Sequence, residues 1–198
     1  RCFALLPDGH QHLLAGRAHA AGASLRSALA MGEPLARDAD LLANLGIAAF
    51  HLGEDDAAER SYGRLLQWAR ERGAVATMVS ALARLPFAQV GAGRWDAARA
   101  AAEEALQLAR GVGQTPLTAF PLAWLALLAA LRGDPVAEDA LLELEQVVAG
   151  QRLGVLVGPV ADIAAWTRMV IRAEAHDTEA ALRQARRITH PIFRRLAA

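Results

Sequence analysis

The sequence predicts an all-α fold, an α-solenoid of antiparallel helix pairs, on three observations. Alanine and leucine dominate a composition that is 54% hydrophobic but only 5% aromatic, which favours helices over strands. A glycine-containing pattern recurs about every 40 residues along the chain. Apolar residues between the copies recur at helical spacing, and no stretch alternates with the period of two that is typical of a strand.

Composition and charge exclude several classes of protein. The 198 residues hold 21 basic and 21 acidic side chains, and every basic one is arginine, so the formal net charge is zero. Zero net charge argues against a dedicated nucleic-acid surface, and the absence of lysine excludes a P-loop and Schiff-base catalysis. The single cysteine, Cys2, excludes an internal disulfide and a CxxC site. We therefore expect no cofactor and no direct nucleic-acid binding.

The chain carries no pattern of export or membrane insertion. The longest apolar run, residues 119–131, is too short to span a bilayer, and the N-terminus lacks a signal-peptide pattern. The sequence thus predicts a cytoplasmic location and no membrane partner. Because the chain starts at Arg1 rather than methionine and ends in mid-pattern, we expect a fragment of a larger protein.

The recurring pattern joins a glycine turn to an alanine pair. Residues 52–58 (LGEDDAA) and 92–98 (AGRWDAA) match at an offset of 40, and residues 132–137 begin a third copy 40 further on. Weaker copies cover residues 15–21 and 174–181, so the spacings are 37, 40, 40 and 43 residues. The pattern predicts a single repeat domain over 1–198, with units of approximately 1–36, 37–73, 74–113, 114–150 and 151–191.

Each unit is predicted to be a helical hairpin. A first helix precedes the glycine, which ends it in the left-handed conformation. A second helix opens with an acidic residue, Asp56, Asp96 or Glu179, which suits its positive end. The adjacent alanines allow two helices to approach closely. The first helices are predicted over residues 39–52, 75–90, 117–131 and 160–173.

Two segments depart from this pattern. Pro86 lies inside the helix predicted over residues 75–90, so we expect a kink or break near Arg84. Residues 150–159 hold three glycines and a proline, which predict a linker or hinge between the third and fourth units.

A basic tail closes the chain. Apolar residues such as Ile188 and Phe193 lie between its arginines, which predicts an amphipathic helix that docks and caps the solenoid. Contact with nucleic acid or with a neighbouring domain is the alternative. The arginines are Arg183, Arg186, Arg187, Arg194 and Arg195.

The repeats resemble tetratricopeptide (TPR) repeats. One unit places large, small, glycine and aromatic residues at the positions of that family, at Leu42, Leu45, Gly46, Phe50, Gly53, Ala58, Tyr62, Leu65 and Leu66. The next supplies Leu82, Leu85, Gly93, Trp95, Ala98, Ala102, Ala105 and Leu106. Its proline, Pro86, departs from the family, and the helices are longer than the usual repeat allows. The resemblance implies a right-handed superhelix.

Residues 90–98 and 124–134 are also similar to the helical-repeat region of large ATP-binding LuxR-type bacterial transcriptional regulators. The resemblance implies a sensor or interaction segment between a nucleotide-binding module and a DNA-binding module. Its partners would be another protein, the neighbouring domains or a small effector. A free-standing scaffold that binds a protein or self-associates as a homo-oligomer is the alternative.

In TPR proteins, ligands lie along the concave face that the first helices form. Transferred to this sequence, that face is mostly apolar and fits an apolar helix, or a small apolar ligand oriented by a polar side chain. Its predicted residues are Asn44, Ile47, Phe50, His51, Ser80, Arg84, Phe87, Phe120, Trp124, Leu127, Trp166 and Arg168. The alternative is that the helices fill the groove, which makes these side chains part of the core.

Catalytic and metal-binding clusters have ordinary explanations. His10, His12 and His19 could converge on a metal if the chain turned, but solvated histidines near a chain end account for them. Carboxylate pairs such as Glu103–Glu104 lie at helix starts or on outward faces, where capping and solvation explain them. The sequence predicts a non-catalytic domain without a metal site, and an enzyme on a helical scaffold is the alternative.

Overall fold

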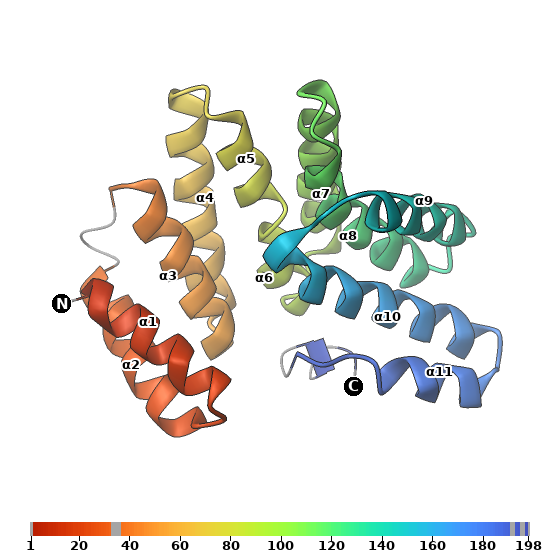
Figure 1. Cartoon of the computed structure of the whole chain (residues 1–198), viewed down its shortest axis with the longest axis horizontal. Helices are drawn as coiled ribbons and strands as arrows, with labels where there is room; N and C mark the ends of the chain where they lie inside the picture. The colour runs from red at the N-terminus through yellow and green to blue at the C-terminus, as the bar shows by residue number, and fades with distance from the viewer. Residues whose placement is uncertain (1, 33–36, 191–192, 195–196, 198) are drawn as a thin grey trace. The chain divides into compact units, whose positions relative to one another are not determined.

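The structure, a computed structural model, describes residues 2–32, 37–190, 193, 194 and 197, and all of their side chains except those of residues 2, 3 and 155. Within this part of the chain every regular element is a helix and no strand is present, which confirms the predicted all-α class (Figure 1). The chain divides into two compact units, Arg1–Arg94 and Trp95–Ala198.

In the first unit, helices that follow one another along the chain pack together (Figure 1). α1 packs against α2, α2 against α3, α3 against α4, and α4 against both α5 and α6. The helices are α1 (Cys2–Leu14), α2 (Ala18–Gly32), α3 (Ala39–Leu52), α4 (Asp55–Glu71), α5 (Val75–Leu82) and α6 (Leu85–Gly91).

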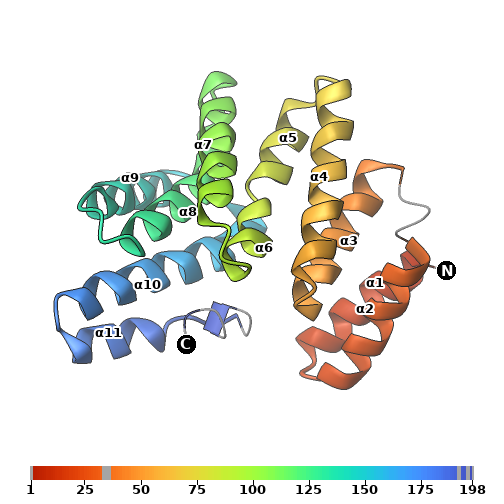
Figure 2. The same cartoon turned by 180° about the vertical axis from the view of Figure 1, so that it is seen from behind.

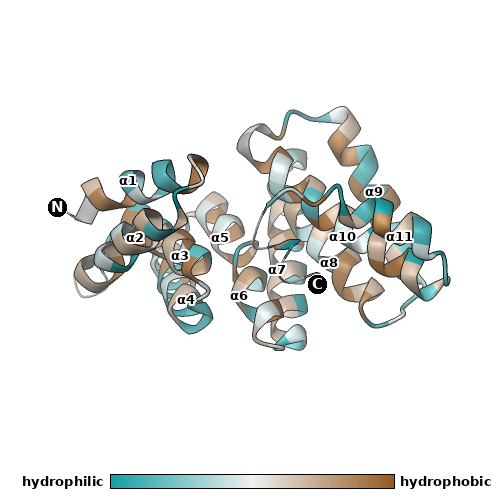
Figure 3. Cartoon of the chain, turned by 90° about the horizontal axis from the view of Figure 1, so that it is seen from below, coloured by the Kyte–Doolittle hydropathy of each residue, from teal (hydrophilic) through white to brown (hydrophobic). Residues whose placement is uncertain are grey.

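In the second unit, α8 is central (Figure 2). α7, α9 and α10 all pack against α8, and α11 packs against α10, whereas α9 and α10 contact each other only sparsely. α9 carries both hydrophilic and hydrophobic residues (Figure 3). The elements are α7 (Trp95–Gly111), η2 (Thr115–Thr118), α8 (Ala119–Ala130), α9 (Val136–Gly150), η3 (Gly154–Leu156), α10 (Val157–Glu174) and α11 (Thr178–Ala185).

The predicted glycine turns all have the same backbone geometry. Each has one residue in the left-handed region, with φ between 58° and 73°, at Gly16, Gly53, Gly93, Gly133 and His176. At each turn this residue donates its N–H to the carbonyl three residues back, and the next residue donates to the carbonyl five back, which is the Schellman cap of a helix. The turns therefore occur at the predicted spacings of 37, 40, 40 and 43 residues.

The predicted helix break at Pro86 is present. α5 ends at Leu82 and α6 begins at Leu85, so Pro86 occupies the first turn of a new helix, where its missing N–H costs no hydrogen bond. The helix predicted over 117–131 is also divided, since a 3₁₀ turn, Thr115–Thr118, precedes α8. The one predicted over 39–52 is α3 with the same bounds.

The predicted linker is shorter than the sequence suggested. α9 continues to Gly150 and α10 begins at Val157, so only residues 151–156 lie between two α-helices, and they include a 3₁₀ turn. Pro159 falls within the predicted linker but lies in the first turn of α10, where a helix tolerates proline.

The basic tail docks through its apolar residues, but not as one helix. α11 ends at Ala185, and no helix covers residues 186–190. Ile188 and Phe193 are each 1% exposed, and the Phe193 ring lies 6.4 Å from that of Trp124. Arg195 lies outside the described residues, and so do residues 33–36, where the first predicted unit ends.

Small residues occur where helices approach closely. Ala58 and Ala98 have no exposed surface, as their place in the alanine pairs predicts. Gly46 in α3 lies against the ring of Tyr62 in α4, and a Cβ atom there would be 2.6 Å from two ring carbons. Burial raises the pKa of Tyr62 well above its ordinary value, although the nearby Arg84 guanidinium opposes that shift.

Candidate functional site

In the first unit, the predicted groove residues are partly buried and bond locally. Asn44 donates its amide to the carbonyl of Asp40, and His51 is bonded through Nδ1 to the carbonyl of Ile47. Phe50 and Phe87 are 7% exposed and their ring centroids lie 4.5 Å apart, so the structure does bring these two predicted residues together.

Two further predicted residues of this unit interact directly. Arg84 donates from Nη1 to both the carbonyl and the hydroxyl of Ser80, one turn earlier, with a distance of 2.9 Å to the carbonyl. Arg84 lies in the break between α5 and α6, and its backbone N–H bonds to Ala81, so its side chain satisfies the Ser80 carbonyl that the break leaves without a helical partner.

In the second unit, most of the predicted residues are core. Phe120, Trp124, Leu127 and Trp166 are at most 4% exposed, so they offer almost no surface to a ligand. Their burial matches the alternative in which the helices fill the groove. Arg168 is different, because it is part-exposed and pairs with Glu145 of α9.

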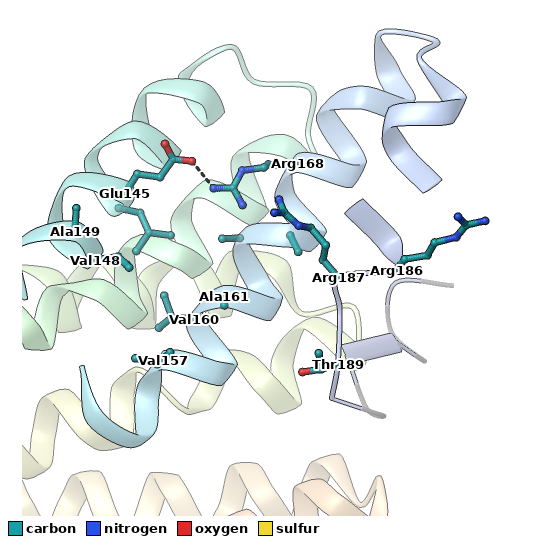
Figure 4. Close-up of a pocket in the computed structure, with 13 residues that line it drawn as sticks. Glu145, Val148, Ala149, Val157, Val160, Ala161, Arg168, Arg186, Arg187 and Thr189 are labelled. Atoms are coloured by element: carbon teal, nitrogen blue, oxygen red, sulfur yellow. Dashed lines mark hydrogen bonds and ion pairs between the residues drawn. The ribbon is translucent and has the colours of Figure 1, made fainter. Parts of the chain in front are cut away.

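A pocket of about 650 Å³ opens beside Arg168 (Figure 4). α9 forms one wall, α10 the floor, and the segment after α11 the other wall. Sparse contact between α9 and α10 leaves the space between them open. The volume is within the roughly 300–1,000 Å³ range of small-molecule sites. The lining residues are Leu144, Glu145, Val148, Ala149, Val157, Val160, Ala161, Ala164, Ala165, Arg168, Arg186, Arg187 and Thr189.

The lining combines an apolar floor with a basic rim. Its charged members are three arginines and one glutamate, a formal charge of +2, in a chain whose net charge is zero. Glu145 is paired with Arg168. No carboxylate among the described residues forms an ion pair with Arg186 or Arg187, and Figure 4 shows Arg187 directed toward Arg168, with Arg186 directed away.

A buried carboxylate anchors the arginine-bearing wall. Asp162 in α10 is 3% exposed and accepts hydrogen bonds from the backbone N–H of Thr189 at 2.7 Å and of His190 at 3.0 Å. The Thr189 hydroxyl also contacts this carboxylate at 3.1 Å. These charge-assisted bonds fix residues 189 and 190, which follow the last residues whose backbone N–H groups bond back to α11.

His190 lies beside this anchor in a part-buried position. Burial lowers the pKa of His190 below its ordinary value, and the negative charge of Asp162 partly offsets the effect. The imidazole is therefore favoured in its neutral form near neutral pH.

The pocket was not predicted, although one signal for it exists in the sequence. Val157, Val160, Ala161, Ala164 and Arg168 follow one another at helical spacing and share one face of α10. The opposite face of that helix buries Ile163 and Trp166. Periodicity alone marks both faces as apolar, so it cannot show which one is left open.

The histidines near the N-terminus form local bonds. His10 is bonded through Nδ1 to the carbonyl of Leu6, and Arg17 donates to Nδ1 of His12. The rings of His10 and His51 lie 5.4 Å apart. Among the residues that the structure describes, no three histidine, cysteine, aspartate or glutamate side chains are grouped as a metal site would need.

No helix in the described part of the chain combines the length and the apolar character needed to cross a membrane. No protein-family model matches the chain, and no curated protein matches it.

Proposed function

We propose that the chain is a non-catalytic helical-repeat domain that binds a partner or an effector. In this proposal the hairpins stack as a TPR-like α-solenoid with a right-handed superhelix. The observation that carries it is the Schellman turn within each predicted hairpin, which recurs at spacings of 37 to 43 residues; the same turn at Gly73 and Gly113 ends the second helix of two hairpins. Repeated hairpins of this kind share a continuous core and present extended surfaces for binding.

The pocket of the second unit supports a binding role. Its apolar floor and few charged groups have the composition of a ligand site, in which apolar contacts give affinity and polar groups give orientation. Arg168, one of the residues assigned to the ligand-binding face, lies on its rim.

We further propose that the domain is the sensor or interaction segment of a cytoplasmic LuxR-type bacterial transcriptional regulator with an ATPase module. The support is the resemblance of residues 90–98 and 124–134 to such repeat regions. The test is the complete reading frame that contains this chain. An upstream nucleotide-binding module and a downstream helix-turn-helix module are expected, and a frame that lacks both would refute this assignment.

A free-standing scaffold is the second candidate, and exposed apolar side chains favour it. Leu14 is 90% exposed, and Leu142 and Leu182 are 56% and 55% exposed. Such residues contribute to interaction surfaces when they are grouped with other apolar groups. Light scattering over a range of concentrations tests self-association. A concentration-dependent dimer that Leu182→Glu or Leu14→Glu abolishes would support the scaffold, and a monomer at all concentrations would exclude its self-associating form.

A further inference from the structure

We propose that the pocket between α9, α10 and the segment after α11 binds a small amphiphilic anion. The ligand has an apolar body that lies on the floor and one carboxylate or phosphate that pairs with Arg187 at the rim. This inference rests on the proposed binding function and assigns it a chemical class of effector.

The floor selects for an apolar body. Val148 on α9 and Val157 on α10 are 41% and 53% exposed, so two large aliphatic side chains border the same opening. Ala161 and Ala164 follow Val157 along the same face of α10 and also line the pocket, and their small side chains leave its depth free. Covering these groups with an aliphatic chain removes apolar surface from water, which favours binding.

The rim selects for a negative head. Arg187 extends over the opening and forms no ion pair with any described carboxylate, whereas Arg168 forms an ion pair with Glu145 (Figure 4). A guanidinium binds carboxylate and phosphate with two parallel N–H donors, so Arg187 can take either head group. A cationic head would meet Arg187 and Arg168 and is disfavoured.

Neighbouring negative charges limit the size of the head. Glu145 lies on the rim, and Asp162 lies beneath Thr189. Both carboxylates are already engaged, Glu145 by Arg168 and Asp162 by backbone N–H groups. A single anionic group therefore matches Arg187, which has no carboxylate partner among the described residues. A polyanionic segment of a protein would bring further negative charges close to Glu145, which would repel them.

Isothermal titration with a matched series of probes tests the class of ligand. The series is octanoate, octyl phosphate, octanol and octylamine, which share one apolar chain and differ in the head. We expect saturable binding of octanoate or octyl phosphate at one site per chain. A charge-assisted hydrogen bond makes the anions bind roughly tenfold or more tightly than octanol. Comparison of octanoate with octyl phosphate decides between the two heads.

Three variants locate the site. Arg187→Gln is expected to weaken binding of the preferred anion roughly tenfold and to leave octanol binding unchanged. Arg183→Gln removes the same charge from α11 outside the pocket lining and is expected to change neither. Ala161→Trp fills the pocket and is expected to abolish binding of every probe. Ala161 is solvent-exposed, so the larger side chain should not unfold the helix, which circular dichroism checks.

Several results would overturn the proposal. They are no saturable binding of either anion, octanol binding as tight as octanoate, an equal loss in Arg183→Gln and Arg187→Gln, or unchanged binding in Ala161→Trp. Co-sedimentation with phosphatidylglycerol vesicles that Arg187→Gln abolishes, in the absence of binding to free octyl phosphate, would assign the site to a membrane lipid instead. A titration without binding would not change the outcome of the reading-frame test of the proposed function. A reading frame that lacks the expected modules would likewise not change the titration result.

Discussion

Replacing Gly46 by alanine is expected to destabilise the first unit, whereas the same replacement at Gly63 is expected to stabilise it. Both glycines lie inside helices, Gly46 in α3 and Gly63 in α4. A Cβ atom at Gly46 would lie 2.6 Å from two carbons of the Tyr62 ring, which is closer than van der Waals contact allows, whereas one at Gly63 would meet nothing within 4 Å.

The two sites differ only in the overpacking term. Alanine gains about 0.8–1.0 kcal/mol over glycine in a helix interior, and this gain applies at both positions. Overpacking of a core costs typically 1–3 kcal/mol, and this cost applies at Gly46 alone because Tyr62 is 1% exposed and held from all sides. Relative to the unsubstituted protein, the free energy of unfolding should therefore rise by about 1 kcal/mol in Gly63→Ala. In Gly46→Ala it should lie about 1–3 kcal/mol below the value for Gly63→Ala.

Urea denaturation followed by circular dichroism measures both changes. A third variant, Tyr62→Leu, provides the control, because adding Gly46→Ala to it should no longer cost stability. If Gly46→Ala and Gly63→Ala raise stability equally, the close contact between Gly46 and the Tyr62 ring is wrong, and so is the α3–α4 packing built on it.

Three further predictions concern the second unit. Ala98→Leu should cost about 1–3 kcal/mol of unfolding free energy in a denaturant titration because Ala98 has no exposed surface, and the exposed Ala97 given the same change should be nearly neutral. Asp162→Asn removes the charge that anchors the tail and should cost about 1–3 kcal/mol, with faster amide exchange at residues 189 and 190, while Asp139→Asn on the surface should leave both unchanged. Because the pKa of His190 is lowered in the folded state, stability should fall as the pH drops below the ordinary histidine value of 6.5, and His190→Gln should flatten that dependence; a steeper loss in the variant would contradict the assignment.

The turns could be predicted because their chemistry is local. Glycine is the residue that most readily takes the left-handed conformation, so Gly53, Gly93 and Gly133 mark helix ends where the repeated pattern places them. His176 shows the limit of that reasoning, since it takes the same conformation without being glycine, and only the spacing of the repeat pointed to it. The break at Pro86 was equally local, because proline lacks the N–H that a helix interior needs.

The open pocket could not be predicted because it depends on packing between segments distant in sequence. Trp124 and Trp166 have apolar neighbours at helical spacing just as Val157 and Ala161 do, and only the tertiary structure separates the buried face from the open one. The same holds for Asp162, whose partners lie 27 and 28 residues further along the chain. An acidic residue within an apolar stretch was its only trace in the sequence.

The uniform turn geometry explains how the spacing can vary without loss of the pattern. The Schellman hydrogen bonds join backbone atoms alone, so the main sequence requirement of such a turn is one residue that can adopt a positive φ. Successive spacings differ by zero or three residues, and three residues rotate a helix by about 300°, within about 60° of a full revolution. An insertion or deletion of that size therefore changes the direction of the apolar face only slightly. A hairpin of such a chain can lengthen during evolution without exposing that apolar face to solvent.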